Sequence, residues 1–111
     1  MNEIKNSVAA IKITPKVAEA ISWNIDCDND HDLLLEGIQE VRIALKSKID
    51  AVARVTKKTT EIVFTYHEIL QLEKVVSDMI TLEMWGRMQK WIESLEEDIY
   101  VATENIESRL A

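Results

Sequence analysis

From about residue 29 to the end of the chain, apolar residues recur three, four and seven positions apart, the spacing of an α-helix with one apolar face. Pro15 is the only proline, and Gly37 and Gly86 are the only glycines. Because proline and glycine mark turns, the pattern predicts an all-α protein. The first apolar series consists of Ile38, Val41, Leu45, Val52, Val55, Ile62, Tyr66, Ile69, Val76 and Ile80, and the second of Met88, Ile92, Leu95, Ile99, Ala102 and Ile106.

The first thirty residues predict one or two short helices and a linker. Ile4, Val8 and Ile11 share one helical face, which favours a short helix that ends before Pro15. Thr14 followed by Pro15 is typical of a helix cap and first turn. We therefore expect a second helix from Pro15 to about Ile25, with Val17, Ala20, Ile21 and Trp23 available for burial, and then a linker from Asn24 to Asp30.

The rest of the chain favours an elongated bundle of three long antiparallel arms, at about 31–57, 60–84 and 87–110. A polar, β-branched run at residues 56–60 has a weak helix preference and predicts the first turn. In this bundle the first and third arms are parallel, so opposite charges can meet. The basic residues are Arg42, Lys46, Lys48, Arg54, Lys57 and Lys58, and the acidic ones are Glu93, Glu96, Glu97, Asp98, Glu104 and Glu107.

Two other arrangements remain open. The unbroken repeat also suits a coiled-coil hairpin with one helix from about His31 to Glu83, although its acidic return arm would then face other acidic residues. Alternation of Ile62, Phe64 and Tyr66 instead favours a strand over residues 60–66.

Size and composition are those of one domain, residues 1–111, with short helices and linker in 1–28 and the bundle or coiled-coil core in 29–111. A net charge of −7 opposes direct contact with nucleic acid or anionic lipid. Cys27 is the only cysteine, and the sequence has neither a signal-peptide pattern nor an uninterrupted apolar span. We expect a cytoplasmic protein without a membrane span.

Candidate chemistry is sparse. The run from Asp26 to Asp32 resembles the start of a calcium loop, but His31 stands where the loop needs glycine, and Gly37 stands where it needs glutamate. His67 has neither Ser77 nor Cys27 at helical spacing, so it lacks a partner for acid–base catalysis. The sequence therefore predicts no catalytic, cofactor or metal site, and we expect a protein that is not an enzyme.

The strongest candidate for function is an apolar cluster around Gly86. On a helix Trp85, Met88 and Ile92 share one face, and Trp91 widens it. Methionine adapts to varied partners and tryptophan often anchors interfaces, although the same spacing suits a bundle core. We expect these four residues to bind a protein partner, either in a homo-oligomer or in a complex with another helical protein.

The predicted function is thus that of a small acidic interaction module: an adaptor, chaperone-like binder or inhibitor. The alternative is an acidic decoy that blocks the basic nucleic-acid groove of an enzyme through its carboxy-terminal carboxylates. Salt separates the two, because an ionic complex weakens steeply with ionic strength and an apolar one does not.

Overall fold

The computed structural model describes residues 7–28, 36–55, 58–82 and 85–110. Their elements follow the order β1 (Val8–Ile13), α2 (Pro15–Asp28), α3 (Glu36–Val55), β2 (Thr60–Thr65), α4 (Tyr66–Leu82), the short 3-10 helix η1 (Gly86–Met88) and α5 (Gln89–Leu110). The prediction of a mostly helical protein is confirmed, with a small two-stranded sheet in addition. Each strand is followed by two α-helices, so the chain repeats one simple pattern twice.

Helix α2 begins where the cap was predicted. The backbone N–H of Val17 donates to Thr14 Oγ1 at 3.3 Å, and Pro15 occupies the first helical position, which needs no N–H donor. The helix continues to Asp28. The predicted linker from Asn24 is therefore wrong up to residue 28, and its last two residues lie outside the described part.

Strand β1 replaces the short helix expected over residues 4–11; residues 4–6 of that helix lie outside the described part. From Ala9 to Ile13 the alternate residues Ala9, Ile11 and Ile13 turn inward, and Ala10 and Lys12 are exposed. A period of two is that of a strand with one buried face. The helical interpretation was wrong because it counted only neighbours along the chain, whereas this segment obtains its hydrogen bonds from β2.

Strand β2 confirms the strand alternative for residues 60–65. It pairs antiparallel with β1, and Phe64 stands opposite Ala9, Ile62 opposite Ile11 and Thr60 opposite Ile13. A continuous helix through this segment is therefore wrong, and the expected second helical arm starts at Tyr66 instead of residue 60.

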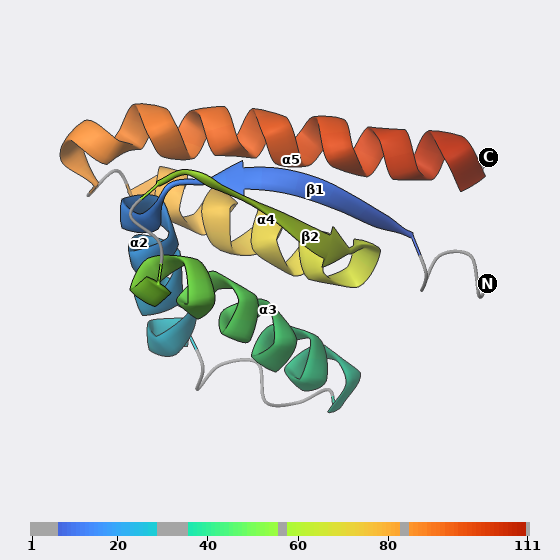
Figure 1. Ribbon diagram of the computed structural model, residues 1–111, viewed down its shortest axis with the longest axis horizontal. Helices are drawn as coiled ribbons and strands as arrows, with labels where there is room; N and C mark the ends of the chain where they lie inside the picture. Colours follow the sequence, from blue (N-terminus) through green and yellow to red (C-terminus); the bar gives the residue numbers. More distant parts are fainter. Residues whose placement is uncertain (1–6, 29–35, 56–57, 83–84, 111) are drawn as a thin grey trace.

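The sheet also determines where the helices lie. It crosses over α4, with α5 along its β1 side and α3 along its β2 side (Figure 1). Helix α2 packs against α3, and α4 packs against α5. Helices α3, α4 and α5 lie within the three predicted arms, but the closed bundle is not confirmed, because the sheet lies between α3 and α5.

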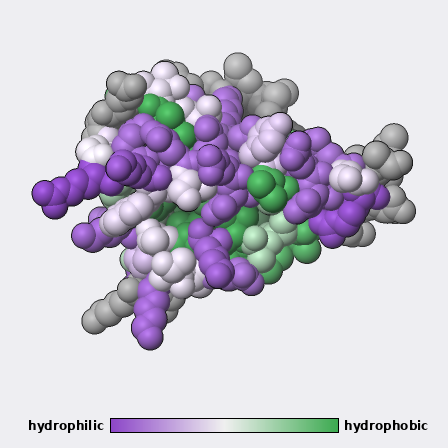
Figure 2. Space-filling view, turned by 90° about the horizontal axis from the view of Figure 1, so that it is seen from above, coloured by the Kyte–Doolittle hydropathy of each residue, from purple (hydrophilic) through white to green (hydrophobic). Residues whose placement is uncertain are grey.

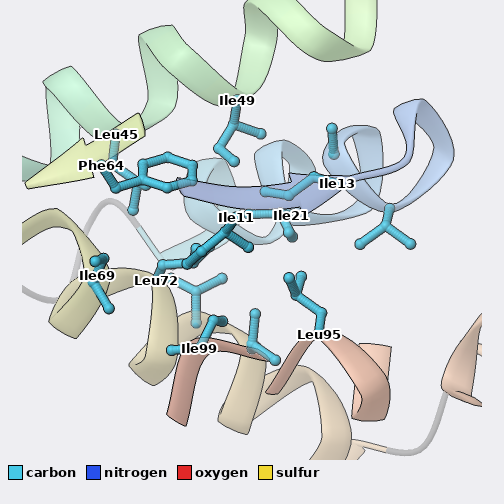
Figure 3. Close-up of a cluster of buried hydrophobic side chains, with 14 of the residues drawn as sticks. Ile11, Ile13, Ile21, Leu45, Ile49, Phe64, Ile69, Leu72, Leu95 and Ile99 are labelled. Carbon is cyan, nitrogen blue, oxygen red and sulfur yellow. The ribbon is translucent and has the colours of Figure 1, made fainter. Parts of the chain in front are cut away.

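The described elements other than η1 bury side chains in one apolar cluster. Figure 3 shows side chains from β1 and β2 between those of α3 and those of α4 and α5. The second apolar series is confirmed as a core stripe from Ile92 to Ile106, with Met88 partly buried at its start. Phe64 is fully buried and lies opposite the small Ala9.

One polar group is built into this core. Thr65 and Glu68 form a reciprocal cap for α4: the N–H of Thr65 donates to Glu68 Oε1 at 2.8 Å, and the N–H of Glu68 donates to Thr65 Oγ1 at 3.2 Å. Lys48 of α3 donates to the same carboxylate oxygen at 2.6 Å and to the Val63 carbonyl at 3.0 Å. These contacts join α3, β2 and α4.

Replacement of Glu68 by Gln should lower the free energy of unfolding by about 1.5–3 kcal/mol, because a charge-assisted hydrogen bond to a buried acceptor is lost. Urea denaturation measures this change. In a Lys48→Met background, Glu68→Gln should lower the free energy of unfolding by a smaller amount, since the cationic partner is already gone. Glu93→Gln is the exposed control and should be nearly neutral; an equal loss in both backgrounds would contradict the coupling.

Candidate protein-binding surface

The predicted partner-binding residues surround the junction of α4 and α5. Trp85 directly precedes η1, Met88 ends η1, and Trp91 lies in the first turn of α5. Gly86 allows the turn because it adopts a φ of 55°, a left-handed conformation that favours glycine. The N–H of Met88 closes the turn on the Trp85 carbonyl at 3.0 Å. Gln89 Nε2 then donates to the Ile80 carbonyl at 3.3 Å and ties the start of α5 to α4.

These four residues divide between core and surface. Ile92 is fully buried and has no area to offer a partner in this conformation. Trp85 and Met88 are partly buried against the core, whereas Trp91 is 50% exposed. Trp91 is thus the predicted residue best placed to be an external contact.

A further tryptophan from α2 joins this surface. Trp23 is 51% exposed, and its ring meets that of Trp85 edge to face with centroids 5.8 Å apart. We call Trp23, Trp85, Met88 and Trp91 the tryptophan surface. The indole N–H of Trp85 is buried and finds no acceptor among the described residues. A buried donor without a partner costs about 1–3 kcal/mol, so an acceptor there would be stabilising.

Trp23 was expected to be available for burial, and half of it is in fact exposed. A closer count along α2 would have shown this. Val17, Ile21 and Ile25 form the buried stripe of α2, whereas Trp23 shares the opposite face with Lys16 and Glu19.

A small depression lies beside Trp91, between the end of β1, the start of α2 and α5. Its volume is about 160 Å³. The buried residues Ile13, Val17 and Leu95 line it, together with the exposed and oppositely charged Lys12 and Asp98. Binding pockets for small molecules are typically about 300–1,000 Å³, so this one suits a single apolar side chain.

Among the residues that the structure describes, which leave out Lys57, the expected neutralisation of α5 by α3 does not occur. Lys46 pairs with Asp26 of α2, and Lys48 pairs with Glu68, because the sheet holds α3 away from α5. Among the described residues, no carboxylate of α5 forms an ion pair. Figure 2, which looks down from the α5 side of Figure 1, shows a mainly hydrophilic face with hydrophobic side chains between the hydrophilic ones.

The other candidate residues form no reactive site in the described part of the chain. No group of three or more His, Cys, Asp or Glu side chains there could hold a metal ion. His67 is exposed, and its ring lies edge to face with that of Tyr66, with the ring centroids 5.8 Å apart. Residues 29–32 of the aspartate-rich run lie outside the described residues. Each described helix is too short or too polar to cross a lipid bilayer.

No known protein family, curated protein or solved structure matches this chain.

The acidic helix does perturb one titratable group. Tyr66 Oη donates to Glu107 Oε1 at 2.9 Å, and this hydrogen bond to the carboxylate, with burial and the nearby negative charge, raises the pKa of Tyr66. The folded state thus favours the neutral phenol. Its contribution to stability is present below a pH of about 10 and is lost as the pH rises through the raised pKa.

Glu107→Gln should therefore lower the pKa of Tyr66 towards the ordinary tyrosine value. Tyrosinate absorbance in a Tyr100→Phe background isolates this group, since the chain has only two tyrosines. Glu104→Gln is the control, because it changes the same charge on α5 without removing the hydrogen bond. Equal pKa values in the two variants would contradict the assignment.

Proposed function

We propose that the protein is a small acidic interaction module without chemistry of its own, which binds a protein partner through the tryptophan surface. The observation that carries the proposal is that Trp23 and Trp91 are both half exposed. Trp23 contacts the partly buried Trp85, and Trp91 follows the partly buried Met88 by three residues. Tryptophan is enriched among residues that contribute most to binding, because its large ring can be buried at little cost in conformational entropy.

In this arrangement the side chains that form the core differ from those that we propose to contact the partner. Ile92 is held in the core, whereas the adjacent Trp91 faces away from it. Burial of apolar area on association contributes about 25 cal/mol per Å², of which a part offsets the lost freedom of the two molecules. Because the helices and the sheet hold these residues in place, little ordering is needed on binding.

The first test is affinity capture with three immobilised forms: the wild type, the double variant Trp23→Ala/Trp91→Ala, and Tyr100→Ala/Val101→Ala. The last pair is equally exposed but lies farther along α5. A true partner should bind the wild type and the control and be lost from the tryptophan variant. The captured protein, purified and mixed with each form, should give a complex by light scattering with the same pattern. Retention of the same proteins by all three forms would contradict the proposal.

Stability measurements show whether a loss of binding reflects a lost contact or a destabilised fold. Trp91→Ala should change the free energy of unfolding by less than about 1 kcal/mol, because half of the ring is already in water. Ile92→Ala should cost about 2–5 kcal/mol, because it opens a cavity in the core. If Trp91→Ala were as destabilising as Ile92→Ala, then Trp91 would be a core residue and loss of capture would not indicate a contact.

A second candidate function is an acidic decoy for a basic groove. It is favoured by the unpaired carboxylates that α3 was expected to neutralise. Glu93, Glu97, Asp98, Glu104 and Glu107 are exposed on α5. Such a surface places negative charges along one helix and would compete with the phosphates of a nucleic acid for a cationic groove.

The decoy makes a different prediction. A partner bound in this way should be released by moderate salt and by added DNA, and should be lost from Glu97→Lys/Glu104→Lys but not from Trp23→Ala/Trp91→Ala. Glu19→Lys/Glu40→Lys, an equal charge change on α2 and α3, is the control. Capture that persists at high salt would contradict the decoy.

A further inference from the structure

Helices α4 and α5 pack against each other along a groove that holds a depression of about 510 Å³. Glu73 lines it from α4, and Glu96, Glu97, Tyr100 and Val101 line it from α5. This volume lies within the about 300–1,000 Å³ typical of binding pockets. Tyr100 is 59% exposed and Val101 is 54% exposed, so the groove offers an aromatic ring and an aliphatic side chain to a partner.

This groove is separate from the tryptophan surface. Tyr100 follows Trp91 by nine residues, which is two and a half turns of an α-helix, so the two rings point to opposite sides of α5. Trp91 borders the depression at the end of β1, whereas Tyr100 lines the depression shared with α4. A partner of one surface therefore does not cover the other.

The groove carries negative charge that is not balanced locally. Glu93 and Asp98 are set aside, because Lys90 lies three residues before the first and Lys12 lines the same depression as the second. The five remaining carboxylates in or beside the groove are Glu73, Glu96, Glu97, Glu104 and Glu107. Against them stands Lys74, the single lysine or arginine of α4, and α5 has no basic residue between residues 93 and 108.

The carboxylates surround the exposed ring of Tyr100. Glu96 and Glu104 are four residues from it on α5 and Glu97 is three residues from it, so all three are its neighbours on the helix surface. Glu73 adds a carboxylate from α4. In the parts of the chain that the structure describes, none of these four carboxylates forms an ion pair. A cation at Tyr100 would thus meet several unpaired negative charges.

A second aromatic residue already responds to this charge. The hydrogen bond from Tyr66 Oη to Glu107, with burial and the negative charges of Glu107 and Glu73, raises the pKa of Tyr66. Carboxylates from both helices therefore act on one point of the groove, and their field favours a positive group there.

We infer that the groove binds a basic segment of a partner protein, in which an arginine guanidinium stacks on the ring of Tyr100 and donates hydrogen bonds to the surrounding carboxylates. A guanidinium suits this place better than an ammonium group, because it is planar, stacks on aromatic rings and donates two parallel hydrogen bonds to a carboxylate. The inference goes beyond the tryptophan surface and does not depend on it. It differs from the acidic decoy because it requires the ring of Tyr100 as well as negative charge.

The probe is fluorescein-labelled hexaarginine, with hexalysine as the probe of equal charge, titrated with the full chain and followed by anisotropy. Hexaarginine should bind more tightly than hexalysine. Tyr100→Ala should weaken hexaarginine binding by about two- to fivefold, because a cation over an exposed ring is lost, and should leave hexalysine binding nearly unchanged. Tyr100→Phe, which keeps the ring, should bind like the wild type. Equal affinities of wild type and Tyr100→Ala for hexaarginine would overturn the inference.

The ionic part has its own test. Glu97→Gln/Glu104→Gln should weaken hexaarginine binding by about fivefold, because two carboxylates next to Tyr100 are lost. Glu19→Gln/Glu40→Gln, the same change of net charge on α2 and α3, is the matched control and should have a much smaller effect. Equal losses in the two double variants would mean that only the net charge of the chain attracts the peptide, and would overturn the inference.

Three further outcomes would also overturn it. Tighter binding of spermine than of hexaarginine would indicate a small polyamine as the occupant. Self-association that is lost with Glu97→Gln/Glu104→Gln would indicate a second copy of the chain. Hexaarginine binding that does not need Tyr100, together with a captured protein that is lost from Trp23→Ala/Trp91→Ala, would leave the proposed function standing without this inference.

Discussion

The structure depends on the pairing of β1 with β2. The two strands come from opposite halves of the chain, and each begins a unit of one strand and two α-helices. A contact so distant in sequence carries a large loop-closure cost, which the pairing offsets only together with the core beneath it. Ile11 and Phe64 show this coupling, since they come from different strands and are buried in the same cluster as side chains of the surrounding helices. The pairing thus joins the two halves of the chain around one apolar cluster.

The same pairing decides how charge is distributed. Because the sheet lies between α3 and α5 (Figure 1), Lys46 and Lys48 of α3 pair with Asp26 and Glu68 instead of with the carboxylates of α5. Lys48 shows the consequence most clearly, because it donates hydrogen bonds to Glu68 in the cap of α4 and to the Val63 carbonyl of β2.

Local signals in the sequence were sufficient for the helices within the three arms, indicated β2 as an alternative, and were insufficient for β1. The spacing of Ile92, Leu95 and Ile99 predicted the buried stripe of α5, and Thr14 with Pro15 predicted the start of α2, because both patterns are satisfied within a few residues. The segment that became β1 reads as a helix from its own residues, and only its partner β2 makes it a strand. The same limit explains why Ile92 is buried and Trp91 is half exposed, although both were predicted to bind a partner. A sequence repeat shows which residues share a helix face, but it does not show which other elements cover that face.

Trp91 and Ile92 show that a core residue and a proposed contact residue can be neighbours in the chain. Adjacent residues on a helix point about 100° apart, so a core side chain and an exposed one can follow each other directly. Ile92 faces inward because it begins the buried stripe that continues through Leu95 and Ile99, and the turn at Gly86 comes shortly before this pair. A substitution at Gly86 would strain a positive φ and could rotate this pair, although a Cβ there would meet no neighbouring atom within 4 Å. The surface we propose for binding therefore contains, between Trp85 and Met88, a backbone conformation that favours glycine.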